Sequence, residues 1–271
     1  MLIQRLKNKA MNRFKSGSSR LVASCLVGAT VLSMSLIPAL GGNRPSGFSV
    51  EFTDCVESIG VTLLQTSEVE ALIPPGFHVV GEGQPVTPVV VRSAHCRISV
   101  DGQRARVGTI LQIGAVIVPP DFTGDINNYT LWYYTSDSKL AHHLKKLGMP
   151  VQLVPTINFQ QIPSADDGPD SFQITVPRPG NPALSLAGEV VPSEASAGTF
   201  TANWWVETNR GTVKMQTHVP EILIGDADLV LTVEEDSSLS DLIGGPTLGF
   251  PILQQFNVFP TAQMDVKILA P

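Results

Sequence analysis

The stretch TFTANWWVETNRGTVKMQTHV, Thr199 to Val219, contains two runs in which apolar or aromatic side chains alternate with polar ones. An alternation of period two is typical of a β-strand that has one buried face. The tripeptide Asn-Arg-Gly, residues 209–211, stands between the two runs and has the composition of a tight turn. This part of the sequence therefore predicts a β-hairpin.

Strand-like composition, rich in Val, Ile, Thr and aromatic residues, recurs along most of the chain. The further runs are PVVVRSA, CRISVDG, TILQIGAVIV, YTLWYYT, SFQITV, ALSLAGEVV and DLVLTVE. Helix signals are confined to three short segments, residues 66–74, 136–148 and 236–244. We therefore expect an α+β domain of predominantly antiparallel β structure, a barrel or cone with a few short peripheral helices.

The first 42 residues have the features of a signal peptide with a basic lead. A basic, Ser-rich stretch, residues 11–20, precedes the apolar run LVASCLVGATVLSMSLIPAL and the pair Gly41-Gly42. Pro38 and the small residues after it favour cleavage, which leaves a single domain, residues 43–271, in a secreted or periplasmic protein. The alternative is a retained anchor, because about 20 apolar residues can span a bilayer. Translation can start at Met1 or at Met11.

The charge of the predicted mature domain argues against two classes of partner. The whole chain has 18 Lys and Arg and 24 Asp and Glu, and residues 1–42 hold six of the basic residues and none of the acidic ones. The rest of the chain therefore has a formal net charge of −12. Nucleic-acid phosphates require cations, so we expect no nucleic-acid partner and no anionic membrane surface as partner. Cleavage of the signal peptide would also leave no stable membrane span.

Two cysteines, Cys55 and Cys96, remain after the predicted cleavage, and in an oxidising compartment we expect them to form a disulfide. A metal or redox pair is the alternative, although Cys-x-x-Cys spacing is absent. The sequence also lacks GxSxG, GxxxxGK and HExxH motifs, and its histidines do not have the spacing of a local metal site. We expect neither a metal nor a cofactor.

Several short segments, in a fixed order, resemble the acetoacetate decarboxylase-like family. They are ALIPPGF (71–77), VVVRSAHCRISVDGQRARVGTILQIGAVI (89–117), YTLWYYTSDSKLAHHLKKLGMP (129–150) and GDADLVLTVEEDSSLSDLIG (225–244). The resemblance implies a β-barrel or cone around an apolar pocket. Because members of the family often form larger assemblies, it also implies that the chain can form a homo-oligomer.

The resemblance also shows where this chain departs from the family. In its decarboxylases two lysines directly follow Gly-Phe-Pro; one forms a Schiff base with a β-keto acid, and the other helps to depress its pKa. Here Gly148-Met149-Pro150 is followed by Val151 and Gln152, and Arg106 stands about where the family has a glutamate. The chain is thus expected to be a divergent member that lacks the Schiff-base lysine pair.

Lys145 and Lys146 precede this turn, on the segment predicted to be helical. At 100° per residue, Lys146 points away from the stripe formed by Leu144 and Leu147, and Lys145 lies at its margin. Cations at a helix end also interact favourably with its dipole. A solvated helix end is the favoured interpretation, and a displaced Schiff-base amine at Lys145 is the alternative. Asp125, on a loop before an aromatic strand, is a weak candidate for acid–base chemistry.

An apolar barrel interior would need polar anchors for a ligand. Arg92 and Arg106 lie in or beside long apolar strands, and an inward arginine binds a carboxylate with two hydrogen bonds. Since side chains alternate along a strand, Tyr133 faces away from Trp132 and Tyr134, and Trp204 faces away from Trp205. We therefore expect at least one of these rings to line the interior. The predicted ligand-binding residues are Arg92, Arg106, Trp132, Tyr133, Trp204 and Met149.

The sequence favours a binding protein over an enzyme: an exported barrel that holds a small, partly apolar ligand or organic acid. Two alternatives stay open. One is an active lyase or decarboxylase that uses a displaced lysine. The other is a structural or surface-interaction protein whose barrel is filled by its own side chains.

Overall fold

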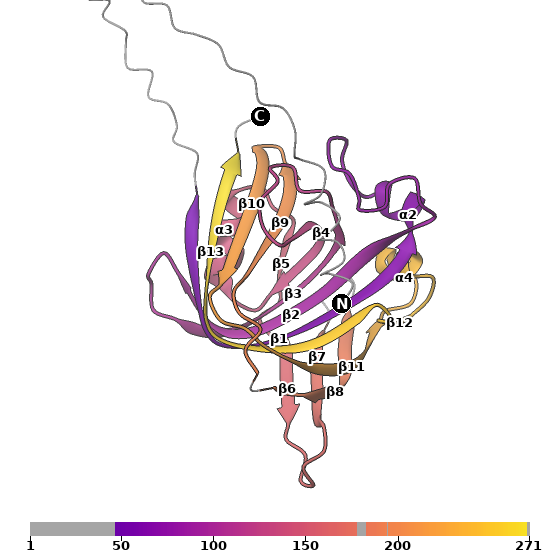
Figure 1. Cartoon of the computed structure of the whole chain (residues 1–271). Helices are drawn as coiled ribbons and strands as arrows, with labels where there is room; N and C mark the ends of the chain where they lie inside the picture. Colours follow the sequence, from indigo (N-terminus) through magenta and orange to yellow (C-terminus); the bar gives the residue numbers. More distant parts are fainter. Residues whose placement is uncertain (1–46, 178–182, 194, 270–271) are drawn as a thin grey trace, which may run out of the picture. The chain divides into compact units, whose positions relative to one another are not determined.

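A closed ring of seven strands forms the centre of the fold. The computed structural model describes residues 47–177, 183–193 and 195–269. The ring follows the order β1-β2-β3-β4-β9-β10-β13 and closes because β13 pairs with β1 (Figure 1). The strands are β1 (Phe48–Gln65), β2 (Val86–Val100), β3 (Arg106–Val116), β4 (Ile126–Thr135), β9 (Phe200–Thr208), β10 (Gly211–Val219) and β13 (Leu253–Leu269). Neighbours are antiparallel except for the parallel pair β4–β9.

The same sheet continues beyond the barrel from the first half of β13. It passes to β11 (Leu223–Val233), β8 (Leu184–Val191), β7 (Asp170–Val176) and β6 (Asn158–Ile162). The short strands β5 (Val151–Leu153) and β12 (Thr247–Gly249) pair with β4 and β11. The expected barrel of mainly antiparallel strands is therefore confirmed, and so is the hairpin, which is β9–β10.

The three predicted helices are present, each somewhat shorter than its sequence signal. They are α2 (Thr66–Glu70), α3 (Ser138–Lys146) and α4 (Ser238–Ile243). Asp137 caps α3 by accepting a hydrogen bond from the Leu140 backbone N–H at 2.7 Å, and Gly148 adopts φ +85° after its end. None of these helices is long and apolar enough to cross a membrane. The predicted signal peptide lies outside the described residues.

Two hydrophobic cores lie on the two faces of the barrel strands. The first lies inside the barrel and is formed by inward side chains of all seven strands, and α3 adds Leu140, Ala141 and Leu144 to it. The second lies between the outer faces of β2 and β3 and the inner faces of β7, β8 and β11. Because β2 and β3 are covered on both faces, each has consecutive apolar residues that belong to opposite cores, Val89–Val91 on β2 and Ile110–Leu111 on β3.

Candidate functional site

A row of polar side chains crosses the barrel interior on five strands. Its members are Glu57 on β1, Arg92 on β2, Gln112 on β3, Tyr133 on β4 and Asn257 on β13. The register places Glu57 opposite Asn257, Arg92 opposite Gln112, and Gln112 opposite Tyr133. Directly paired residues share one face of a sheet, and this face carries the interior core residues Cys55, Val90 and Ile110 two positions away. We call these five residues the interior polar cluster.

An ion pair organises the interior polar cluster. Arg92 Nε donates to Glu57 Oε2 at 2.5 Å, and Arg92 Nη1 donates to Gln112 Oε1 at 2.8 Å. Asn257 Nδ2 donates to the second carboxylate oxygen of Glu57 at 3.2 Å. The side chains of Arg92 and Glu57 are 14% and 6% exposed. A guanidinium has five N–H groups, and among the described residues only two of those on Arg92 have partners.

Tyr133 contributes a neutral hydroxyl to the same region. Burial raises the pKa of this phenol well above its usual value, although the nearby positive charge of Arg92 works in the opposite direction. The ring therefore stays protonated throughout the physiological range and cannot serve as a base there. It remains a hydrogen-bond donor and acceptor at the wall of the barrel interior.

The Cys55–Cys96 disulfide, as expected from the sequence, is present and joins β1 to β2 with a Cα–Cα distance of 4.4 Å. Cys55 belongs to the interior core and precedes Glu57 by two residues, so the two side chains share a face. The bond therefore fixes β1 against β2 close to the point where Glu57 meets Arg92.

The lysines lie elsewhere. Lys145 and Lys146 are exposed at the end of α3, which agrees with the favoured interpretation of a solvated helix end. Lys214 is the only buried lysine of the described ranges, and it lies on the outer face of β10. Its Nζ atom is 2.6 Å from both Asp121 Oδ2 and Thr123 Oγ1 and 5.0 Å from the centroid of the Trp205 ring.

The ion pair of Lys214 holds the loop between β3 and β4. Partial burial disfavours the charge of Asp121, but the hydrogen bonds from Lys214 and Thr123, together with the charge of Lys214, outweigh this and lower its pKa. Lys214 is thus a paired cation that anchors a loop rather than a free amine. Asp125, on the same loop, is exposed, and its carboxylate accepts a hydrogen bond from the Thr201 backbone N–H at 3.0 Å.

The structure brings together part of the predicted ligand-binding set. Arg92 and Tyr133 meet in the interior polar cluster, and Trp204 and Met149 belong to the surrounding interior core. Trp132 packs against the second core instead, because it faces away from Tyr133. Arg106 is exposed at the first position of β3 and pairs with Ile98 of the interior core, so it lies on the inward face but at the exposed end of the barrel, outside the interior polar cluster. Its contact with a ligand stays a prediction.

Three members of the interior polar cluster were missed from the sequence, namely Glu57, Gln112 and Asn257. Gln112 had a usable signal, since it is the single polar residue in the run ILQIGAVIV, residues 110–118. Glu57 and Asn257 lie on strands that were not predicted at all.

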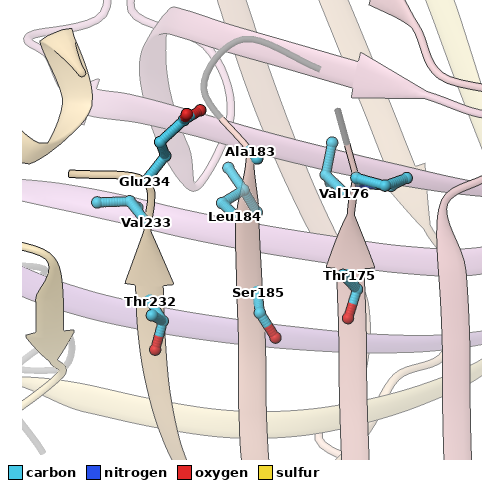
Figure 2. A pocket seen from close by; sticks show the side chains of 9 residues that line it. Thr175, Val176, Ala183, Leu184, Ser185, Thr232, Val233 and Glu234 are labelled. Atoms are coloured by element: carbon cyan, nitrogen blue, oxygen red, sulfur yellow. The ribbon is translucent and has the colours of Figure 1, made fainter. Parts of the chain in front are cut away.

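Two cavities lined by described residues lie outside the barrel. One, of about 430 Å³, is formed where β7 and β11 end and β8 begins; Figure 2 shows Val176, Leu184 and Val233 among the residues around it. The other, of about 400 Å³, lies between α4 and the segment before β12 and is lined by Glu235, Asp236 and Asp241. Within the described part of the chain, no three His, Cys, Asp or Glu side chains are placed to hold a metal ion.

Similar folds occur among enzymes of known structure. The enduracididine biosynthesis enzyme MppR, in complex with pyruvate, superposes with a TM-score of 0.52 over 88% of this chain and 96% of its own, at 11% identity. An acetoacetate decarboxylase-like enzyme from Sphingomonas wittichii RW1 superposes with a TM-score of 0.51 over 88% of this chain and 99% of its own, also at 11% identity. The chain has the acetoacetate decarboxylase-like fold.

The fold resemblance inferred from the sequence is thereby confirmed over most of the chain. MppR with HEPES buffer bound gives a TM-score of 0.53 over 92% of this chain and 97% of its own, at 10% identity. Neither the models of known protein families nor the curated protein sequences contain a match to this chain. At these identities the likeness concerns the fold, and the chemistry must be argued from the residues.

Proposed function

We propose that this protein is an exported, non-catalytic relative of the acetoacetate decarboxylase-like enzymes that binds a small, partly apolar organic acid inside its barrel. The observation that carries the proposal is Arg92, which points inward, is partly accessible, and has three N–H groups without a partner among the described residues. Such a guanidinium edge can take both oxygens of a carboxylate. The fold is compatible with such a ligand, since MppR carries pyruvate.

The surroundings of Arg92 supply the apolar part of the site. Val90 lies two residues before Arg92 on the same strand face, and Trp204 belongs to the same interior core. A ligand with a short carbon chain would bury its apolar surface against such side chains while its carboxylate meets the guanidinium. Glu57 neutralises Arg92 in the free protein, which keeps the buried cation paired until a ligand arrives.

Ligand binding can be tested by titrating the purified protein with butanoate and following heat or NMR shifts. The variant Glu57→Gln/Arg92→Met should bind butanoate at least tenfold more weakly than Glu57→Gln, because a hydrogen-bonded charge contributes about 1.5–3 kcal/mol. Arg106→Met is the matched control, since it removes an exposed arginine, and should bind as the wild type does. The absence of butanoate binding, or equal binding by Glu57→Gln and the double variant, would reject the proposal.

The lysine positions support a role without Schiff-base chemistry, because the amines of Lys145 and Lys146 are exposed and Lys214 is paired outside the barrel. Borohydride reduction in the presence of acetoacetate should therefore give no covalent adduct by intact mass, under conditions where an acetoacetate decarboxylase is trapped. A reduced adduct at Lys145 would instead establish the rival function, a lyase with a displaced amine.

Export rests on the predicted signal peptide and is supported by the disulfide, which persists in oxidising compartments. N-terminal sequencing of the protein from its native cells should find a chain that begins near residue 43. A chain that retains residues 1–42 in the membrane fraction would favour the anchor instead.

A further inference from the structure

Two buried oxygen atoms on β4 have no hydrogen-bond partner among the described residues. They are Asn128 Oδ1 and Thr130 Oγ1, and each residue is only 3% exposed. A buried polar atom without a partner costs free energy, and native proteins satisfy nearly all of them with protein, water or ligand. These two atoms therefore mark a place that can accept hydrogen bonds from a ligand.

Both side chains face the barrel interior. Asn128 pairs with Trp204 on β9, which belongs to the interior core, and Thr130 pairs with Gly114 on β3. Gly114 lies under Trp204: a Cβ atom there would come within 2.7 Å of the Trp204 ring. Since directly paired residues share a face, Asn128, Thr130 and Trp204 line the same wall of the interior.

This wall lies across the barrel from Glu57, since β1 is three strands from β4 in one direction around the ring and four in the other. The register of paired residues can be followed from Asn128 to β1 in both directions around the barrel. In one direction Asn128 pairs with Trp204, Trp204 with Met215, Met215 with Val266, and Val266 with Phe48 of β1. In the other direction Tyr129, the residue after Asn128, pairs with Ala115, Ala115 with Val89, and Val89 with Thr62 of β1. Glu57 lies between Phe48 and Thr62, so the tilt of the strands places it near the height of Asn128 on the opposite wall.

We infer that the ligand is a small hydroxy acid whose carboxylate binds Arg92 and whose hydroxyl group binds Asn128 and Thr130. This inference rests on the proposed function and specifies its ligand. A hydroxyl fits both orphan atoms, because it can donate its hydrogen to Asn128 Oδ1 and accept a hydrogen bond from Thr130 Oγ1. A plain acid would leave both atoms unpaired, and a site built to bond a hydroxyl discriminates against ligands that lack it.

An ammonium group suits this wall less well than a hydroxyl. Asn128 and Thr130 are neutral, and the carboxylate of Glu57 is bonded to Arg92 and Asn257 on the other side. A desolvated cation would lack a counter-charge at this position, and a cation cannot accept the hydrogen of the Thr130 hydroxyl.

The test compares 4-hydroxybutanoate with butanoate by calorimetric titration of the purified full chain. The hydroxy acid should bind about tenfold more tightly, the effect of one to two net hydrogen bonds. Thr130→Val and Asn128→Leu should bring the ratio of the two affinities close to one and leave butanoate binding in place. Thr130→Ser keeps the hydroxyl and should keep the preference.

Thr66 provides a matched control. Its Oγ1 atom is also buried without a partner, but the residue begins α2 and does not lie on the barrel strands. Thr66→Val should keep the preference for 4-hydroxybutanoate. Equal binding of the two acids, or a preference that survives both Thr130→Val and Asn128→Leu, would overturn the inference while leaving acid binding intact. Failure of both acids to bind, even where butane-1,4-diol binds, would overturn the proposed function as well.

Discussion

Replacing Arg92 with methionine is expected to lower the free energy of unfolding by about 3–5 kcal/mol, because it leaves the carboxylate of Glu57 buried without its cation. The long apolar side chain of methionine keeps most of the packing, so the loss reports on charge rather than volume. Urea denaturation at neutral pH measures the effect, provided that the m-value, the slope of the free energy of unfolding against urea concentration, is the same for both proteins.

The double variant Glu57→Gln/Arg92→Met should recover most of this loss, since a neutral amide needs no counter-charge and can still accept the hydrogen bond from Asn257. Arg106→Met, which removes an exposed arginine, should stay within about 0.5 kcal/mol of the wild type. If Arg92→Met cost no more than Arg106→Met, the ion pair would not be the organising contact of the barrel interior.

The sequence was sufficient to predict the hairpin β9–β10, the strands β2, β3 and β4 and the three helices, because each has a local signal. In β4, alternation alone separated Tyr133 from Trp132 and Tyr134, and the structure places Tyr133 inside the barrel and both neighbours on the other face. The aromatic pair of β9 divides in the same way, with Trp204 inside.

The strands that close the barrel, β1 and β13, were missed for a physical reason. The register of β1 slips between Thr53 and Val56, where Asp54 has φ +53°, so its apolar pattern changes phase in mid-strand. In β13, Pro260 interrupts the strand signal. The strand tolerates this proline because Pro260 lies opposite the register shift of β1, between the pairs Cys55–Phe259 and Thr53–Thr261.

The same two strands carry the residues of the candidate site that could not be predicted. An inward arginine on β2 was a reasonable expectation at Arg92, but its partners are distant in the sequence. Glu57 is 35 residues from Arg92, and Asn257, which also bonds Glu57, is 200 residues from Glu57. Only the closed register brings them together. The sequence also did not show that Arg106 stands at the exposed start of β3, because the apolar run that follows it begins before the strand enters the core.

Removing the Cys55–Cys96 bond is expected to lower the free energy of unfolding by about 4 kcal/mol, because the bond closes a loop of 41 residues that would otherwise be free in the unfolded chain. The wild type with and without reductant, and the variant Cys55→Ala/Cys96→Ala, can be compared by urea denaturation. Reductant should destabilise the wild type and leave the variant unchanged, while the reduced wild type should resemble the variant.

The disulfide also constrains the interior polar cluster, which gives this prediction a second readout. With β1 and β2 no longer joined next to Glu57, the pairing of Glu57 with Arg92 should loosen, and butanoate affinity should fall along with stability in the reduced protein. Stability that falls without any change in affinity would mean that strand pairing alone holds the ion pair. Equal stability of the oxidised and reduced wild type would mean that the bond contributes nothing to the stability of the fold. The disulfide would then no longer support the proposal that the protein is exported.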